Sequence, residues 1–173
     1  MNITLKKTVL IACALVPLFS VAKPLPEQAQ LAVKLQLPSI TSGVYARPYV
    51  AVWIENEQRE AIRTVQLWVG KDEWLKDLRS WWRKAGRYDR NMVDALTGAT
   101  RPAGEYRFSW DGKDQQGKTV AQGNYTFSVE VVREHGGRNL VRKKITLAEQ
   151  DFDVRIKATQ ETGIINLIYK SGK

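Results

Sequence analysis

The sequence has 173 residues, and its 27 Lys and Arg residues against 18 Asp and Glu residues give a formal net charge of +9. It holds one cysteine, Cys13, and one histidine, His135, which leaves almost no material for a zinc site or a Ser-His-Asp triad. The basic residues are scattered and no RNA- or DNA-binding motif is present, so no nucleic acid partner is expected. In an exported protein this charge favours anionic membrane surfaces, acidic proteins or phosphorylated cofactors instead.

Residues 1–22 are predicted to be a signal peptide. A basic start is followed by an apolar run at residues 8–19, and Ser20-Val21-Ala22 places small residues where a signal peptidase reads them. The apolar run is too short for a stable transmembrane helix, and its continuation past Cys13 disfavours a lipoprotein signal. Cleavage after Ala22 leaves 173 − 22 = 151 residues, no cysteine and a net charge of (27 − 2) − 18 = +7. The mature chain is therefore predicted to be periplasmic, a single domain and not an integral membrane protein.

After a short N-terminal linker at residues 23–30, the chain has the pattern of an antiparallel β protein. Apolar residues alternate with polar ones in most segments, which is typical of half-buried strands. Eight strands are predicted, at residues 31–37, 49–54, 62–70, 105–110, 123–131, 140–147, 152–156 and 164–169. The second and third strands are expected to form a hairpin, with Val65, Leu67 and Val69 on one face of the third strand and Trp68 on the other.

One helix is predicted at residues 72–86, between the third and fourth strands. Asp72 suits the N-cap, apolar residues recur at helical spacing, and Gly86 suits the C′ position. The helix is rich in tryptophan, which is expected to pack it onto the sheets. Residues 86–104 are then predicted to form a long polar loop, and long loops inside compact domains are often functional.

Residues 110–127 read W-D-G-x-D-x-x-G-x-x-V-x-x-G-x-Y-x-F. This motif is similar to the Ig-like repeat of bacterial flagellar hook-capping proteins, in which Asp and Gly set tight turns and aromatic residues fill a sandwich. Asp111 and Asp114 lack the remaining ligands of a calcium site. Together with the strand pattern, the motif predicts an all-β fold. The expected architecture is an Ig-like antiparallel β-sandwich over residues 31–170, with one inserted Trp-rich helix and a long loop.

Within the predicted loop, residues 94–100 read Asp-Ala-Leu-Thr-Gly-Ala-Thr. This D-x-x-T-G-A-T sequence resembles the attachment signal of FAD:protein FMN transferases, which link FMN through a phosphoester to the last Thr. The resemblance implies that Thr100 is the covalent acceptor and Asp94 the acidic recognition residue. Three residues would complete the signal, namely Thr97, Gly98 and Ala99. Glycine there can adopt positive φ and does not obstruct an approaching enzyme. Because Thr-Gly-Ala-Thr is also an ordinary turn composition, a plain loop is the alternative.

Basic and aromatic residues near this motif suit a bound FMN. Guanidinium groups bind phosphate well, and the candidates to offset the phosphate charge are Arg101, Arg87 and Arg90. The aromatic residues near enough in sequence to cover the flavin ring are Trp81, Trp82 and Tyr88. The chain has no nucleotide-binding Gly-rich loop and no metal site, so a separate transferase is expected to attach the FMN.

The order of features across residues 50–147 resembles an uncharacterised family of predicted periplasmic proteins that carry a domain of unknown function. Members look like partners of FMN transferases and of PepSY-type membrane reductases. The resemblance implies an exported, flavin-carrying electron-transfer protein that is not itself an enzyme. Because a fold does not determine a function, the alternative is a cofactor-free periplasmic Ig-like module for binding or assembly.

Overall fold

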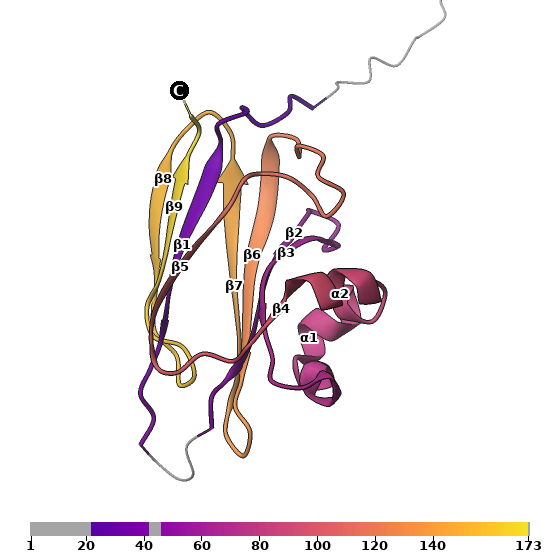
Figure 1. Ribbon diagram of the computed structural model, residues 1–173. Helices are drawn as coiled ribbons and strands as arrows, with labels where there is room; N and C mark the ends of the chain where they lie inside the picture. Colours follow the sequence, from indigo (N-terminus) through magenta and orange to yellow (C-terminus); the bar gives the residue numbers. More distant parts are fainter. Residues whose placement is uncertain (1–21, 42–45, 173) are drawn as a thin grey trace, which may run out of the picture.

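The computed structural model describes residues 22–41 and 46–172, so all of the predicted signal peptide except Ala22 lies outside the described residues. Two sheets pack face to face as a β-sandwich (Figure 1). The first sheet has the order β5-β1-β9-β8, formed by Gly104–Trp110, Gln30–Leu37, Ile165–Lys170 and Phe152–Ile156. The second has the order β4-β3-β2-β6-β7, formed by Thr97–Gly98, Ala61–Trp68, Tyr49–Glu55, Gly123–Val132 and Arg138–Leu147. The predicted sandwich of antiparallel strands is confirmed, and the unpredicted β4 pairs in parallel with β3.

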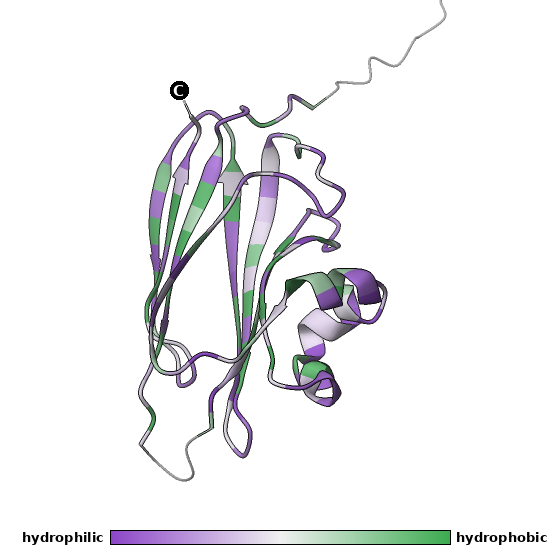
Figure 2. Ribbon diagram, viewed as in Figure 1, coloured by the Kyte–Doolittle hydropathy of each residue, from purple (hydrophilic) through white to green (hydrophobic). Residues whose placement is uncertain are grey.

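The main core lies between the two sheets and follows from the alternation of side chains along the strands (Figure 2). On β1 the residues that point inward are Leu31, Val33, Leu35 and Leu37, and on β6 they are Phe127, Val129 and Val131. Burying one such side chain contributes about 1.5–3 kcal/mol. The period-two pattern is sufficient to assign these strands because each has one face in the core.

Strand β2 differs because both of its faces are buried. Val50, Val52 and Ile54 point between the sheets, whereas the residues that point outward are also apolar. These outward residues are Tyr49, Ala51 and Trp53, which belong to a second core outside the sandwich. A sheet with an apolar outer face needs a cover, and the helical insertion that follows β3 supplies it (Figure 1).

A β-bulge in β3 changes the face that its residues use. Val52 pairs with Gln66 while Trp53 pairs with Thr64, so β3 has one more residue than β2 at this point. As a result, Val65 packs against the core between the sheets together with Trp68, whereas Leu67 and Val69 belong to the outer core. The prediction that Val65 shares a face with Leu67 and Val69 is therefore wrong, because the bulge interrupts strict alternation.

The helical insertion consists of four short segments in place of one long helix. These are the 3₁₀-helix η1 (Asp72–Asp77), the α-helix α1 (Arg79–Trp81), the π-helix η2 (Trp82–Gly86) and the α-helix α2 (Arg90–Leu96). The predicted single helix at 72–86 is thus divided, and the predicted loop at 86–104 is wrong where α2 and β4 lie. Asp89 begins α2 as its N-cap, since its carboxylate accepts a 2.9 Å hydrogen bond from the amide of Met92.

Residues 23–29, expected to act as a linker, pack against the end of the sandwich. Leu25 and Ala29 are buried, and the amide of Leu25 donates a 2.9 Å hydrogen bond to the carbonyl of Val120. This segment therefore adds to the core between the sheets. Among the described residues, no helix combines the length and the apolar character that crossing a membrane requires.

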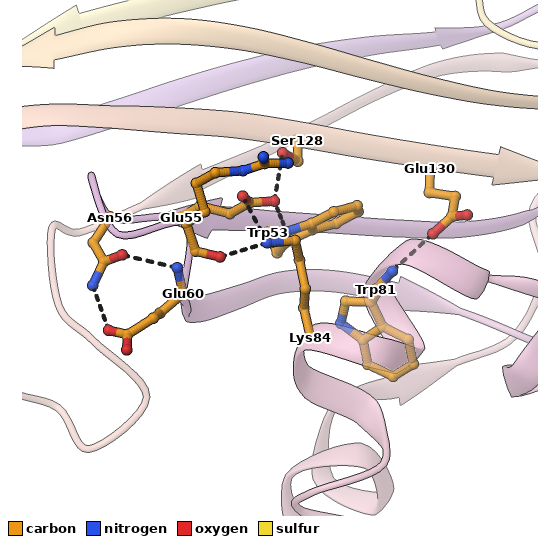
Figure 3. Close-up of polar contacts among 9 residues, drawn as sticks. Trp53, Glu55, Asn56, Glu60, Trp81, Lys84, Ser128 and Glu130 are labelled. Atoms are coloured by element: carbon orange, nitrogen blue, oxygen red, sulfur yellow. Dashed lines mark hydrogen bonds and ion pairs between the residues drawn. The ribbon is translucent and has the colours of Figure 1, made fainter.

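Two buried glutamates join the helical insertion to the outer face of the second sheet (Figure 3). Glu130 on β6 accepts hydrogen bonds from the backbone amides of Ser80 and Trp81, at 3.0 and 2.9 Å, which would otherwise be unpaired at the start of α1. Arg138 on β7 also donates to this carboxylate, at 2.7 Å. Glu130 therefore anchors the beginning of α1 to two strands.

The second glutamate, Glu55, lies at the end of β2 and accepts a 2.8 Å hydrogen bond from the indole Nε1 of Trp53 (Figure 3). Its other carboxylate oxygen lies 3.1 Å from the ammonium of Lys84, which reaches down from η2. A buried carboxylate is costly without such partners. The insertion therefore supplies the cation that makes the burial of Glu55 possible.

Replacing Glu130 by alanine is expected to lower the free energy of unfolding by about 3 kcal/mol, because two buried amides lose their acceptor. The Glu130→Gln variant keeps an acceptor oxygen and is expected to lose less. Urea denaturation followed by tryptophan fluorescence measures both. Equal losses in the two variants would show that the negative charge, and not the capping of α1, is what matters.

Candidate functional site

The D-x-x-T-G-A-T segment lies where the helical insertion ends and the chain crosses to the first sheet (Figure 1). Asp94 is on α2, Thr97 and Gly98 form β4, and Ala99 and Thr100 begin an irregular segment that leads to β5. Ala99 is exposed and Thr100 is partly exposed. The motif is thus in regular secondary structure up to Gly98 and in an accessible, irregular segment after it.

Thr97 and Gly98 have structural contacts that the sequence did not indicate. The hydroxyl of Thr97 donates a 2.7 Å hydrogen bond to the carbonyl of Val93, and the carbonyl of Gly98 accepts a 2.9 Å bond from the amide of Val69. Gly98 is not among the described glycines with positive φ, so the left-handed conformation that a glycine permits is not used there. Thr97 and Gly98 therefore fix the start of the accessible segment.

The side chains of Thr100 and of Trp74, a tryptophan of η1, both lie close to Gly70. A Cβ atom added to Gly70 would lie 2.9 Å from Cζ3 of Trp74 and 3.9 Å from Cγ2 of Thr100. Both side chains therefore approach Gly70, where only a glycine leaves room for the indole. Trp74 also stacks on Tyr49, with ring centroids 5.3 Å apart and planes inclined by 17°.

Two cations flank this region. The ammonium of Lys71 lies 4.9 Å from the centroid of the Trp74 ring, and the guanidinium of Arg101 lies 6.0 Å from the centroid of Trp68. Both residues are exposed. Lys71 has a weak contact with Glu73 at 3.9 Å, whereas Arg101 makes no ion pair with any described residue. Each cation therefore lies near an aromatic ring, with Trp74 packed on the outer core and Trp68 in the core between the sheets.

The predicted acidic residue Asp94 is exposed and pairs with Arg90 one helical turn away, at 2.8 Å. Arg90 also pairs with Asp72 at the start of η1, and its hydrogen bonds to Asp72 and Asp94 raise its pKa. Arg90 is thus engaged by two carboxylates. Arg87 lies over the ring of Tyr88, 4.6 Å from its centroid, and Tyr88 is exposed.

The structure does not support equal roles for the three aromatic residues predicted near the motif. Trp81 is fully buried and its Nε1 donates a 3.0 Å hydrogen bond to the hydroxyl of Thr64, so its ring faces the outer core. Trp82 is only partly buried and lines a hollow with four cations, which are Lys76, Arg79, Arg83 and Arg138. The aromatic side chain that approaches Gly70 together with Thr100 is Trp74, which sequence proximity to the motif did not single out.

Trp74 and Gly70 were missed because they lie far from Thr100 in the sequence. They approach it only because β4 pairs with the end of β3, at Leu67 and Trp68. The Gly70-Lys71 step directly after a strand was the one available signal, since a glycine at that place permits a close approach. An aromatic residue four positions later could have been connected with it.

Tyr49, which supports Trp74, supplies a test of this arrangement. Burial, with smaller contributions from Glu134, Asp77 and Glu73, raises its pKa from 10.0 to about 12. The folded state therefore favours the neutral phenol, so this stabilisation is complete below pH 10 and is lost as the pH rises from 10 to about 12.

We expect Tyr49→Phe to lose stability less steeply than the wild type between pH 10 and pH 12. Urea midpoints measured across this range give the slopes, and Tyr88→Phe, which removes an exposed phenol, is the control. Identical slopes for the wild type and Tyr49→Phe would show that Tyr49 is not buried beneath Trp74.

Comparison with known proteins identifies the family of this chain. No curated protein matches the chain. A family model described as "Predicted periplasmic protein (DUF2271)" matches residues 30–164, which include the second sheet, the helical insertion and every strand of the first sheet except β9. The chain therefore belongs to the DUF2271 family of predicted periplasmic proteins.

Proposed function

We propose that this protein is a periplasmic electron carrier in which FMN is joined through its phosphate to the hydroxyl oxygen of Thr100. The observation that carries the proposal is the position of Thr100. It stands at the beginning of an irregular, accessible segment, directly before Arg101, and its side chain approaches Gly70, as does the ring of Trp74 on which Lys71 lies. The D-x-x-T-G-A-T sequence ends at this residue.

Accessibility supports the attachment step. A transferase must bring its own catalytic groups to the acceptor, because a threonine hydroxyl is a weak nucleophile. The segment from Ala99 to Pro102 is mostly exposed and forms no strand or helix, so it offers a place where an enzyme can approach. The pairing of β4 holds the residues before this segment in one position, which presents the acceptor in a defined direction.

The proposed attachment step is a phosphoryl transfer and needs no oxidant or reductant. The oxygen of Thr100 attacks the phosphorus of FAD that carries the riboflavin group, and a P–O bond to threonine forms. The bond from that phosphorus to the AMP phosphate breaks, AMP leaves, and the hydroxyl proton passes to a base of the transferase. A separate FAD:protein FMN transferase with a divalent metal ion is the proposed partner for this step.

The side chains around Thr100 suit the product. A phosphodiester carries negative charge, and the cations proposed to offset it are Arg101, the next residue, and Lys71, which lies over Trp74. The indole of Trp74 is held by Tyr49 on one side and offers aromatic surface near the acceptor. The flavin itself would supply the redox chemistry, and a PepSY-type membrane reductase is the proposed electron-exchange partner.

The acceptor is tested by co-expressing the protein with an FMN transferase in a host that exports both. We expect wild-type protein and Thr100→Ser to gain the mass of FMN and to fluoresce in a denaturing gel, and Thr100→Ala to do neither. Thr97→Ala is the matched control, because it removes a neighbouring hydroxyl that is already bonded to Val93. Covalent flavin on Thr100→Ala, or none on the wild type, would refute the site.

The role of Asp94 is tested against the second partner of Arg90. We expect Asp94→Ala to lower the yield of attached flavin several-fold, because the transferase loses its acidic contact. Asp72→Ala removes the other carboxylate that pairs with Arg90 and is expected to leave the yield unchanged. If both variants lose the same amount of flavin, Asp94 acts by holding Arg90 and not by contacting the enzyme.

A further inference from the structure

A groove of about 980 Å³ crosses the outer face of the second sheet between the β2–β3 hairpin and β7. One wall is formed by the hairpin, with Arg59 at its tip, and the other wall is formed by β7. Val141 and Ile145 of β7 point into the core between the sheets, so Arg142 and Lys144 point outward into the groove. This groove shares no residue with the surroundings of Thr100.

The carboxylates in and beside the groove already have partners. Glu55 pairs with Lys84, Glu57 accepts a 2.9 Å hydrogen bond from the amide of Asn124, and Glu60 accepts one from Asn56 at 2.8 Å (Figure 3). The three cations are different. Within residues 22–41 and 46–172, none of Arg59, Arg142 and Lys144 has an acidic side chain as an ion-pair partner. These three cations outnumber Glu55 and Glu57, the two carboxylates that line the groove, so its lining carries a net positive charge.

Arg59 has an unusual backbone conformation, with φ +65°. This left-handed conformation suits glycine and is unfavourable for a side chain such as that of arginine. The turn around it closes through hydrogen bonds between the backbones of Asn56 and Arg59 and of Asn56 and Glu60, both 3.0 Å long. The carbonyl of Arg59 also accepts a hydrogen bond from Lys84. The two of these contacts that involve Arg59 use its main-chain atoms, so a glycine would preserve them.

The side chain of Arg59 thus lines the groove, whereas only its main chain contributes to the turn. Residues held in sparsely populated backbone conformations cluster at functional sites. Arg142 and Lys144 lie two residues apart on one strand, which separates their backbones by about 7 Å. Two neighbouring anionic groups on one ligand fit such a pair, with Arg59 approaching from the opposite wall.

We propose that this groove binds a small ligand that carries at least two phosphate groups. Guanidinium groups bind phosphate oxygens in pairs, and an ammonium adds a compact charge. The hydroxyl of Thr126 and the side chains of Asn124 and Thr146 also line the groove and provide polar contacts for the rest of such a ligand. The groove is a recess between two walls, so a compact ligand fits it better than a flat bilayer does.

The test is titration calorimetry of the mature protein with inorganic pyrophosphate at about 0.15 M salt, where the attraction of a basic protein for anions is largely screened. We expect saturable binding with one ligand per chain. Arg142→Gln/Lys144→Gln is expected to weaken it at least about tenfold, because two charge-assisted contacts are lost.

The matched control is Arg79→Gln/Arg83→Gln, which removes the same charge from the hollow beside Trp82. We expect this control to bind pyrophosphate as the wild type does. Equal weakening in the two double variants would overturn the proposal, because it would mean attraction to the overall charge. The absence of binding to the wild type at millimolar pyrophosphate would overturn it as well.

Arg59→Gly is a second test, because it is expected to change the stability of the protein and its affinity for pyrophosphate in opposite directions. We expect this variant to unfold at a higher urea concentration than the wild type, because the left-handed strain is relieved, and to bind pyrophosphate about tenfold more weakly. A variant that is stabilised but binds normally would remove Arg59 from the site. Binding to phosphatidylglycerol vesicles that pyrophosphate fails to displace would show that the occupant is a membrane surface and would overturn the assignment.

This inference is independent of flavin attachment. Thr100→Ala keeps the whole groove and is expected to bind pyrophosphate as the wild type does. Arg142→Gln/Lys144→Gln keeps the whole motif and is expected to receive FMN normally. Failure of either proposal therefore leaves the other one standing.

Discussion

The position of the helical insertion depends on two carboxylates that are buried beneath it. Glu130 accepts the free amides at the start of α1, and Glu55 receives the ammonium of Lys84. Because a buried carboxylate without partners is strongly unfavourable, these contacts restrict the insertion to one arrangement on the sheet. Apolar packing beneath the helices would by itself permit more than one arrangement, since it has no direction. The polar contacts therefore give the outer core its orientation.

The orientation of the insertion also sets the position of the candidate site, because the last helix of the insertion leads directly to it. Met92 and Val93 of α2 are buried in the outer core, and the two residues of β4 then pair with the end of β3. Thr100 follows directly, where the pairing has ended. The site thus consists of a short accessible segment that begins at a rigid point. A modifying enzyme and its substrate protein need this combination, because the acceptor must be both reachable and well placed.

Some basic side chains of the protein form ion pairs with acidic side chains, and others do not. On the outer face of the second sheet the carboxylates hold the insertion and the hairpin, whereas Arg59, Arg142 and Lys144, which line the groove, have no acidic ion-pair partner among the described residues. Arg101, directly after Thr100, likewise makes no ion pair with a described residue. Local charge of this kind favours phosphate-bearing ligands more specifically than the total charge does. A periplasmic carrier with a phosphoester-linked cofactor and a separate phosphate-binding groove is consistent with that distribution.

The sequence by itself was sufficient for the eight longer strands, because strands with one face in a core show alternating apolar residues and β2, with both faces buried, shows a continuous apolar run. It was also sufficient to locate the D-x-x-T-G-A-T segment and the tryptophan-rich cover. It did not predict the bulge at Val65, the helix α2 or the strand β4, since these depend on the partner strand and on capping by Asp89. Only the tertiary structure brought Trp74 to Thr100 and buried Trp81 away from it. Contacts between residues so far apart in the chain produce no periodic pattern in the sequence, so they could not be predicted from it. The same holds for the groove, whose walls bring Arg59 and Arg142 together only in the folded protein.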